Sequence, residues 1–168
     1  LTPTENALMS DPSEFIWFEL NTDDIDLASD FYTDVVPWGA EHGPQSGDEP
    51  YMLLKADGRN AAGVMRLPDE ARVRGPPPHW LGYLQVDHLE ETLEQLVDLG
   101  GTDQSGVIEL DQMGRMAVVA DPEGAVFGLW EGERSTFGDE RPEQNAPGAC
   151  SWFELNAGDI DAAWSFYS

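Results

Sequence analysis

The chain repeats its own beginning near its end, and this repeat constrains the fold more than any other feature. The segment IWFELNTDDIDLASDFYT, residues 16–33, returns as SWFELNAGDIDAAWSFYS, residues 151–168, at a constant offset of 135 residues. The blocks WFELN, DID and FY are identical in the two copies. Chance does not produce identity at so many fixed positions. The sequence therefore predicts one complete structural unit, followed by the first strand and helix of a second unit built on the same plan.

Hydrophobic periodicity predicts the elements of the complete unit. A regular strand over residues 15–20 would place Trp17 and Glu19 on one face and Ile16, Phe18 and Leu20 on the other. A helix then follows Asp23 or Asp24, and strands are expected near 38–42, 50–56 and 61–67. After a proline-rich stretch the pattern starts again, with a strand over 80–86, a helix capped by Asp87 and strands near 106–110, 114–120 and 125–131.

This order of elements, βαβββ twice, indicates an α+β fold. Each module has one sheet face to bury under its helix, so two modules are expected to pair into a curved mixed sheet around a concavity, with the helices on the outer face. The predicted domains are a flexible N-terminus at 1–14, a complete domain at 15–131 with modules 15–67 and 79–131, a linker at 132–148, and an incomplete second domain at 149–168.

The charge of the chain excludes several classes of partner. There are 33 acidic and 8 basic residues, a net charge of −25, and the acids are spread along the chain. Such a surface repels nucleic acid phosphates and anionic lipid, so neither partner is predicted. It resembles the surfaces of halophilic proteins, which predicts stabilisation by salt. One cysteine, Cys150, no long apolar run and no secretory pattern at the N-terminus favour a cytoplasmic location.

Two motifs carry a family resemblance. The helix signature D-I-D-x-A-x-x-F-Y at 24–32 and the run GRMAVVADPEGAVFGLW at 114–130 resemble the vicinal oxygen chelate superfamily, which includes glyoxalase I, extradiol dioxygenases and bleomycin-resistance proteins. Within it the chain is most similar to glyoxalase-like proteins with two tandem domains. The resemblance covers about 15–131 as a full domain, and 150–168 matches the start of a second one.

The resemblance also implies where a metal would lie. Enzymes of the superfamily bind a divalent metal on the concave face through residues of the first, fourth, fifth and eighth strands. At the matching positions this chain has Trp17, Leu81 and Gly128, and the fourth-strand segment 60–68 contains no carboxylate. These side chains cannot ligate a metal, so no metal and no cofactor is predicted. His79 is the one histidine expected near the concavity, while His42 and His88 are expected at the surface.

The remaining candidates are polar or aromatic side chains expected to face the concavity. Glu19, which is copied as Glu154, is the best candidate for a catalytic group or an orienting acceptor, although a structural pairing with Arg115 or with backbone donors at the cavity rim would also account for it. For Arg115 two roles stay open, which are to hold an acidic group of the ligand or to pair with Glu19. The predicted ligand-binding residues are Trp17, Glu19, Met65, Tyr83, Gln85, Arg115 and Trp130.

Three functional hypotheses from different classes remain. The first is a metal-free protein that binds an aromatic or hydrophobic small molecule in the concavity. The second is a metal-dependent lyase, isomerase or dioxygenase that uses atypical ligands or a missing second domain. The third is a structural remnant in which 149–168 pairs with another chain, giving a homodimer with swapped segments.

Overall fold

The computed structural model describes residues 14–43, 50–67, 75–110, 113–133, 142 and 146–168. Almost all of the predicted N-terminal segment at 1–14 and part of the predicted linker at 132–148 lie outside these residues. The first module contains β1 (Phe15–Thr22), α1 (Ile25–Val35), β2 (Trp38–His42), β3 (Tyr51–Ala56) and β4 (Arg59–Arg66). The second contains β5 (His79–Gln85), α3 (Leu89–Asp98), β6 (Thr102–Asp103), β7 (Ile108–Leu110), β8 (Gly114–Ala120) and β9 (Val126–Gly132).

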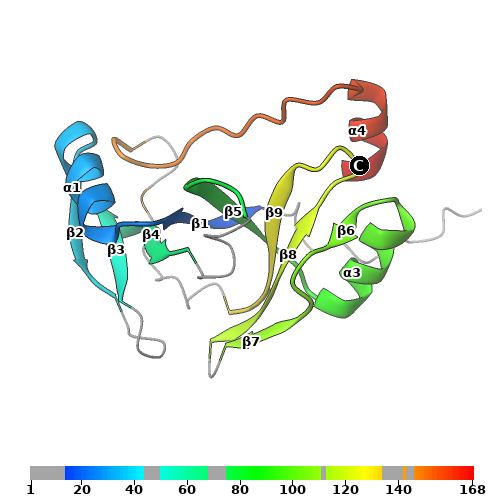
Figure 1. Cartoon of the computed structure of the whole chain (residues 1–168), viewed down its shortest axis with the longest axis horizontal. Helices are drawn as coiled ribbons and strands as arrows, with labels where there is room; N and C mark the ends of the chain where they lie inside the picture. The colour runs from blue at the N-terminus through cyan, green and yellow to red at the C-terminus, as the bar shows by residue number, and fades with distance from the viewer. Residues whose placement is uncertain (1–13, 44–49, 68–74, 111–112, 134–141, 143–145) are drawn as a thin grey trace, which may run out of the picture.

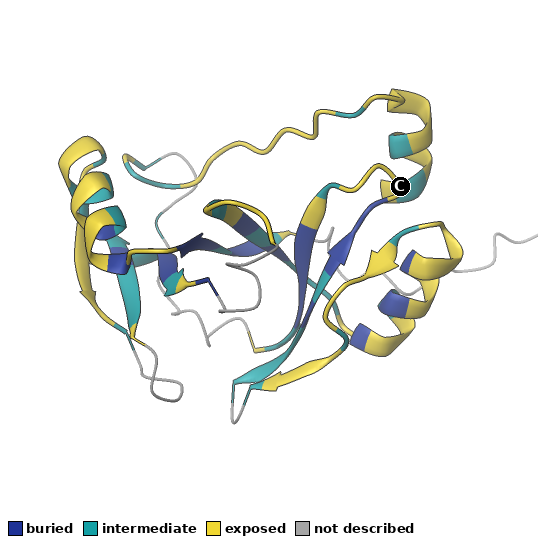
Figure 2. Ribbon diagram, viewed as in Figure 1, coloured by how far each residue is buried: buried dark blue, intermediate teal, exposed yellow. Residues whose placement is uncertain are grey.

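The strands form one mixed sheet that is not closed, and it confirms the α+β prediction. The strand order is β2-β3-β4-β1-β5-β9-β8-β6, and β7 pairs with β8. The pairs β1–β4 and β5–β9 are parallel, whereas β1 and β5 join the two modules in antiparallel register. Both halves of the sheet curve toward the same side, and the buried segments gather in its central strands (Figures 1 and 2).

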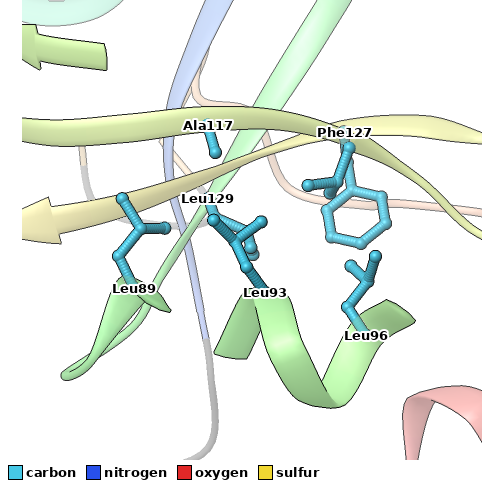
Figure 3. Packing of buried hydrophobic residues seen from close by; sticks show 7 residues of the cluster. Leu89, Leu93, Leu96, Ala117, Phe127 and Leu129 are labelled. Carbon is cyan, nitrogen blue, oxygen red and sulfur yellow. The ribbon is translucent and has the colours of Figure 1, made fainter. Parts of the chain in front are cut away.

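The outer face of each half is covered by its helix. Asp24 caps α1 by accepting a hydrogen bond from the backbone N–H of Leu27 at 3.0 Å. Beneath α1 lies a cluster of Leu20, Ile25, Leu54, Ala62 and Val64. In the second half, leucines at i, i+4 and i+7 of α3 point at β8 and β9 (Figure 3). That cluster contains Leu89, Leu93, Leu96, Ala117, Val119, Phe127 and Leu129. The helical spacing of these apolar residues explains why both helices bury one face against the sheet.

The inner face carries a third cluster, and one detail of it departs from the expected alternation. The cluster consists of Ile16, Trp17, Leu81, Tyr83 and Trp130. A regular strand would have placed Ile16 on the outer face with Phe18. The register between β1 and β5 shifts between Phe15 and Trp17, and this irregularity lets Ile16 join the inner cluster.

The C-terminal copy forms its helix but not its strand. Helix α4 (Ile160–Tyr167) is present, whereas residues 151–157 pair with no strand in the described chain. The strand predicted there is absent because the neighbours that the first copy uses, β4 and β5, are already paired with β1. The segment instead runs past the sheet as an extended chain (Figure 1).

Side chains on both ends hold this segment to the domain. The Phe153 ring stacks on Phe18, with ring centroids 5.1 Å apart and planes at 12°. The Glu123 carboxylate accepts hydrogen bonds from the backbone N–H groups of Gly158 at 2.7 Å and Asp159 at 2.9 Å. The Tyr167 hydroxyl donates to Asp121 Oδ2 at 3.0 Å. The second copy of the helix therefore docks on the turn between β8 and β9. No helix in the described part of the chain has the length and apolar character of a membrane crossing.

Candidate functional site

The inner face is organised as rows of side chains across neighbouring strands. One row joins Leu53, Gly63, Glu19 and Leu81, because these residues are Cα partners across β3, β4, β1 and β5. The next row joins Trp17, Tyr83, Gly128 and Val118 across β1, β5, β9 and β8. The two rows lie next to each other on β1 and β5, in the middle of the sheet. Glu19, Trp17 and Tyr83 are therefore neighbours by register, as the sequence predicted from their shared face.

A buried carboxylate lies at the centre of these rows. The Tyr51 hydroxyl donates to Glu19 Oε1 at 2.8 Å, and the Tyr83 hydroxyl donates to Glu19 Oε2 at 3.0 Å. The Trp17 indole N–H donates in turn to the Tyr51 oxygen at 3.1 Å. Only 8% of Glu19 is exposed. We call Glu19, Tyr51, Tyr83 and Trp17 the inner-face cluster.

Burial dominates the electrostatics of the inner-face cluster. Desolvation raises the pKa of Glu19 above 4.5, and the hydrogen bonds from Tyr51, Tyr83 and Trp17 counteract only part of that increase. The pKa of each tyrosine is also raised, first by burial and then by the neighbouring carboxylate. Both phenols therefore stay protonated at neutral pH and act as donors to Glu19. A carboxylate with a raised pKa is a good acceptor and a candidate base.

Two glycines make room for the phenol rings. A Cβ on Gly63 would lie 1.9 Å from the Tyr51 hydroxyl oxygen, and a Cβ on Gly128 would lie 2.2 Å from Tyr83 Cδ1. Both distances are far below van der Waals contact. Any larger residue at either position would push a tyrosine away from Glu19. Gly128 also occupies the place where the family resemblance implies a glutamate ligand, so the Tyr83 ring fills that space.

The other predicted binding residues surround the inner-face cluster at different distances. Trp130 is 1% exposed and belongs to the same apolar cluster as Trp17 and Tyr83. Met65 is the Cα partner of both Tyr51 and Asn21, one row away from Glu19. Gln85 is the Cα partner of Trp130, and its amide N–H donates to the Gly132 carbonyl at 3.2 Å. These three residues line the same inner face as the cluster.

Arg115 does not lie on this face, and its expected pairing with Glu19 is wrong. It shares the parity of Ala117 and Val119, which pack under α3 on the outer face. Its guanidinium forms an ion pair with Glu90 and another with Glu131, the latter at 2.6 Å. Glu131 also accepts a hydrogen bond from the Leu89 backbone N–H at 2.8 Å. Arg115 therefore supports the start of α3. That start is preceded by His88 rather than the expected Asp87.

His79 lies at the edge of the inner face. It is the Cα partner of Asn21, the next inward residue after Glu19 on β1. Its Nδ1 is 2.8 Å from the Pro77 carbonyl oxygen, so Nδ1 carries the proton and donates to it. His42 and His88 are exposed, in agreement with the expectation for both. The fold thus brings a histidine near the concave face, as predicted, but in a row separate from the carboxylate.

The donors on this face do not fit the divalent metal that the resemblance implies. Both oxygens of Glu19 accept tyrosine protons, and Glu41, which continues the same row onto β2, pairs with Lys55. The neighbouring ligand positions hold Trp17, Leu81 and Gly128. A metal needs several donors at suitable geometry. Among the residues that the structure describes, no three His, Cys, Asp or Glu side chains gather closely enough to bind an ion.

The position of Tyr51 in the site was not predicted from the sequence. This tyrosine opens β3, and the strand is apolar on both faces, so alternation does not show which face each residue takes. The available signal was Gly63, an isolated glycine inside a strand, which is typical of a close approach by another group. Tyr51 is the group that makes that approach.

Comparison with known proteins concerns the family of the chain. A family model described as a glyoxalase-like domain matches residues 17–130. CFP32 of Mycobacterium tuberculosis (strain CDC 1551 / Oshkosh), a glyoxylase by name, is 31% identical over 152 residues, which are 90% of this chain and 57% of that protein. The anthracycline biosynthesis protein DnrV of Streptomyces peucetius is 30% identical over 166 residues, 93% of this chain and 59% of its own length. The chain thus spans somewhat more than half the length of these relatives.

Solved structures support the fold. A hypothetical protein of Bacillus halodurans C-125 superposes with a TM-score of 0.55 at 12% identity, covering 79% of this chain and 99% of that one. Methylmalonyl-CoA epimerase of Mycobacterium tuberculosis superposes with a TM-score of 0.51 at 19% identity, covering 76% and 94%. At these identities the likeness concerns the arrangement of strands and helices.

Proposed function

The chain belongs to the glyoxalase-like domain family of the vicinal oxygen chelate superfamily, and from that premise we propose that it binds a small organic molecule on its concave face without a metal ion. The observation that supports this most is the inner-face cluster. It places one buried carboxylate among Trp17, Tyr83 and Trp130, and aromatic surfaces with a few oriented polar groups are typical of small-molecule sites.

The energetic cost of Glu19 supports a functional role. Burying a carboxylate in an apolar cluster costs several kcal/mol, which hydrogen bonds only partly offset. A leucine or methionine would fill the same space at lower cost. A protein that needed only a stable core would gain nothing from a carboxylate at this position. A group that orients a ligand or accepts its proton accounts for that cost.

The names of the relatives are consistent with a small organic ligand. One is a glyoxylase by name and another is named for anthracycline biosynthesis. Anthracyclines are polycyclic aromatic compounds, and the cluster of two indole and two phenol rings on the inner face suits a flat aromatic molecule. We therefore favour an aromatic ligand.

Tryptophan fluorescence tests this proposal directly. We expect saturable quenching by members of a panel of non-indole aromatic compounds, because Trp17 and Trp130 lie in the inner cluster. Trp17→Phe should weaken that response, whereas Trp152→Phe should leave its midpoint unchanged, because Trp152 is exposed at the far segment. An absence of saturable quenching across the panel would refute the proposal.

Metal-dependent catalysis is the competing function, and a different measurement decides it. Elemental analysis of the purified protein should show no stoichiometric zinc, nickel, manganese or iron, since both oxygens of Glu19 are engaged by tyrosines and Glu41, farther along the same row, pairs with Lys55. One equivalent of such a metal, lost in Glu19→Gln, would replace our proposal with a lyase or dioxygenase.

The C-terminal segment supports a separate proposal about assembly. We propose that two copies associate through residues 149–168, where Trp152, Ile160 and Trp164 are 77%, 76% and 74% exposed. In the first copy of the repeat the counterpart of Ile160 is Ile25, which is 8% exposed against the sheet. Large apolar side chains exposed in this way favour association.

A further inference from the structure

We infer that the ligand of the concave face carries a hydrogen-bond donor, and preferably a cationic one, next to its aromatic part. This inference rests on the proposed function and specifies its ligand class. It follows from the direction of each hydrogen bond in the inner-face cluster and from where the basic side chains lie.

The hydrogen bonds within the inner-face cluster run toward Glu19, either directly or through Tyr51. A tyrosine hydroxyl has one proton, and Tyr51 and Tyr83 each give theirs to the carboxylate. The Tyr51 oxygen also accepts a hydrogen bond from the Trp17 indole N–H. The polar groups that a ligand can still contact are then the Tyr83 oxygen and the remaining lone pairs of Glu19. A carboxylate has about four acceptor positions and no donor when ionised. A ligand that reaches the cluster therefore meets acceptors.

The described basic side chains near this face are already engaged, and His79 at its edge donates its Nδ1 proton to the Pro77 carbonyl. Lys55 pairs with Glu41, and Arg115 is held by glutamates on the outer face. Arg59 and Arg66 stand at the two ends of β4. An anionic ligand would therefore face an uncompensated buried carboxylate, and like charges at such a site repel strongly.

The charge of the whole chain acts in the same direction. A net charge of −25 creates a negative potential around the molecule that raises the local concentration of cations and lowers that of anions. This long-range effect is screened by salt, whereas a hydrogen bond to a buried carboxylate is screened much less. Measurements in concentrated salt can therefore separate the local preference from the general one.

Three ligands of matched shape test the inference. Naphthalene-2-methanamine, naphthalene-2-methanol and naphthalene-2-carboxylate share one aromatic body and differ in the polar group. We expect calorimetric titration of the full chain in about 1 M KCl, where the Debye length is about 3 Å, to give the order amine, alcohol, carboxylate, with the amine bound at least about tenfold more tightly than the carboxylate.

Two variants with the same change in net charge complete the experiment. Glu19→Gln should reduce the ratio of amine to carboxylate affinity by about tenfold or more, because it removes the charged acceptor. Glu94→Gln, at an exposed position on α3, should leave that ratio unchanged. Circular dichroism checks that both variants are folded, and the ranking in the unmodified protein stands without them.

The outcomes separate this inference from the proposed function. Tighter binding of the carboxylate, or an amine preference that persists in Glu19→Gln, would overturn the inference and leave small-molecule binding intact. Failure of all three naphthalenes to bind, together with an absence of fluorescence quenching by the wider panel, would overturn both.

Discussion

Replacing Gly63 with alanine should disrupt the inner-face cluster, although none of the four residues of the cluster is itself substituted. The added Cβ would lie 1.9 Å from the Tyr51 hydroxyl oxygen and 2.5 Å from its Cζ, so the ring must move by more than 1 Å to reach ordinary contact. That movement removes its hydrogen bond to Glu19. A hydrogen bond to a charged group contributes about 1.5–3 kcal/mol, and overpacking adds about 1–3 kcal/mol.

We therefore expect a loss of about 3 kcal/mol in the free energy of unfolding, which lowers Tm by roughly 10 °C in a chain of this size. Gly39→Ala is the matched control, because a Cβ there has nothing within 4 Å, and its effect should stay below about 0.5 kcal/mol. Thermal melts followed by circular dichroism measure both variants in molar KCl.

A double-mutant cycle identifies the cause of the loss. In a Tyr51→Ala background no ring remains for the added Cβ to clash with. Gly63→Ala should then lower the free energy of unfolding by less than about 1 kcal/mol. If Gly63→Ala melts at the temperature of Gly39→Ala, or costs the same with and without the Tyr51 ring, then the packing of that ring over Gly63 is not what holds the cluster together.

Four further predictions concern charge and the C-terminal segment. Burial raises the pKa of Glu19 above 4.5, so its contribution to stability is present at pH below 4.5 and is lost as the pH rises through the folded-state pKa. In thermal melts, Glu19→Gln should therefore gain stability relative to the parent protein as the pH is raised from 4 to 8. A difference in Tm between Glu19→Gln and the parent protein that does not change with pH would contradict the raised pKa of Glu19. Raising KCl from about 0.1 M to 1 M should increase Tm, since screening relieves the repulsion of a net charge of −25, and a constant or falling Tm would exclude the halophilic interpretation. Glu123→Gln should speed amide exchange at Gly158 and Asp159, whose N–H groups it binds, with Glu94→Gln as the control; equal exchange in both variants would argue against this docking. Light scattering in high salt should report a dimer, and Trp152→Ser combined with Trp164→Ser should shift it toward a monomer, whereas a strict monomer in the parent chain would rule out association through 149–168.

Much of the fold could be predicted because it depends on local patterns. The repeat, the cap of α1 at Asp24 and the leucine spacing of α3 each indicate one element, and the order of elements then indicates the sheet. The absence of a strand at 151–157 was not predictable in the same way. The amino acids of this segment suit a strand, but a strand needs a neighbour, and the local sequence does not reveal that the neighbours of the first copy are already taken.

The candidate site was predictable only where one face of a strand differs from the other. On β1 the polar Glu19 alternates with apolar Phe18 and Leu20, and its inward direction was found correctly. On β8 both faces are apolar, because Met116 and Val118 face inward while Ala117 and Val119 face α3. Alternation then carries no information, and Arg115 was assigned to the wrong face.

Glu19 joins the two modules more closely than the strand pairing alone suggests. It lies on β1, while one of its donors comes from β3 of the same module and the other from β5 of the second. Neither module by itself can supply both protons. A fragment that ended after β4 would leave this carboxylate half satisfied, so the two modules should unfold in a single cooperative transition, with a calorimetric enthalpy equal to the van't Hoff enthalpy.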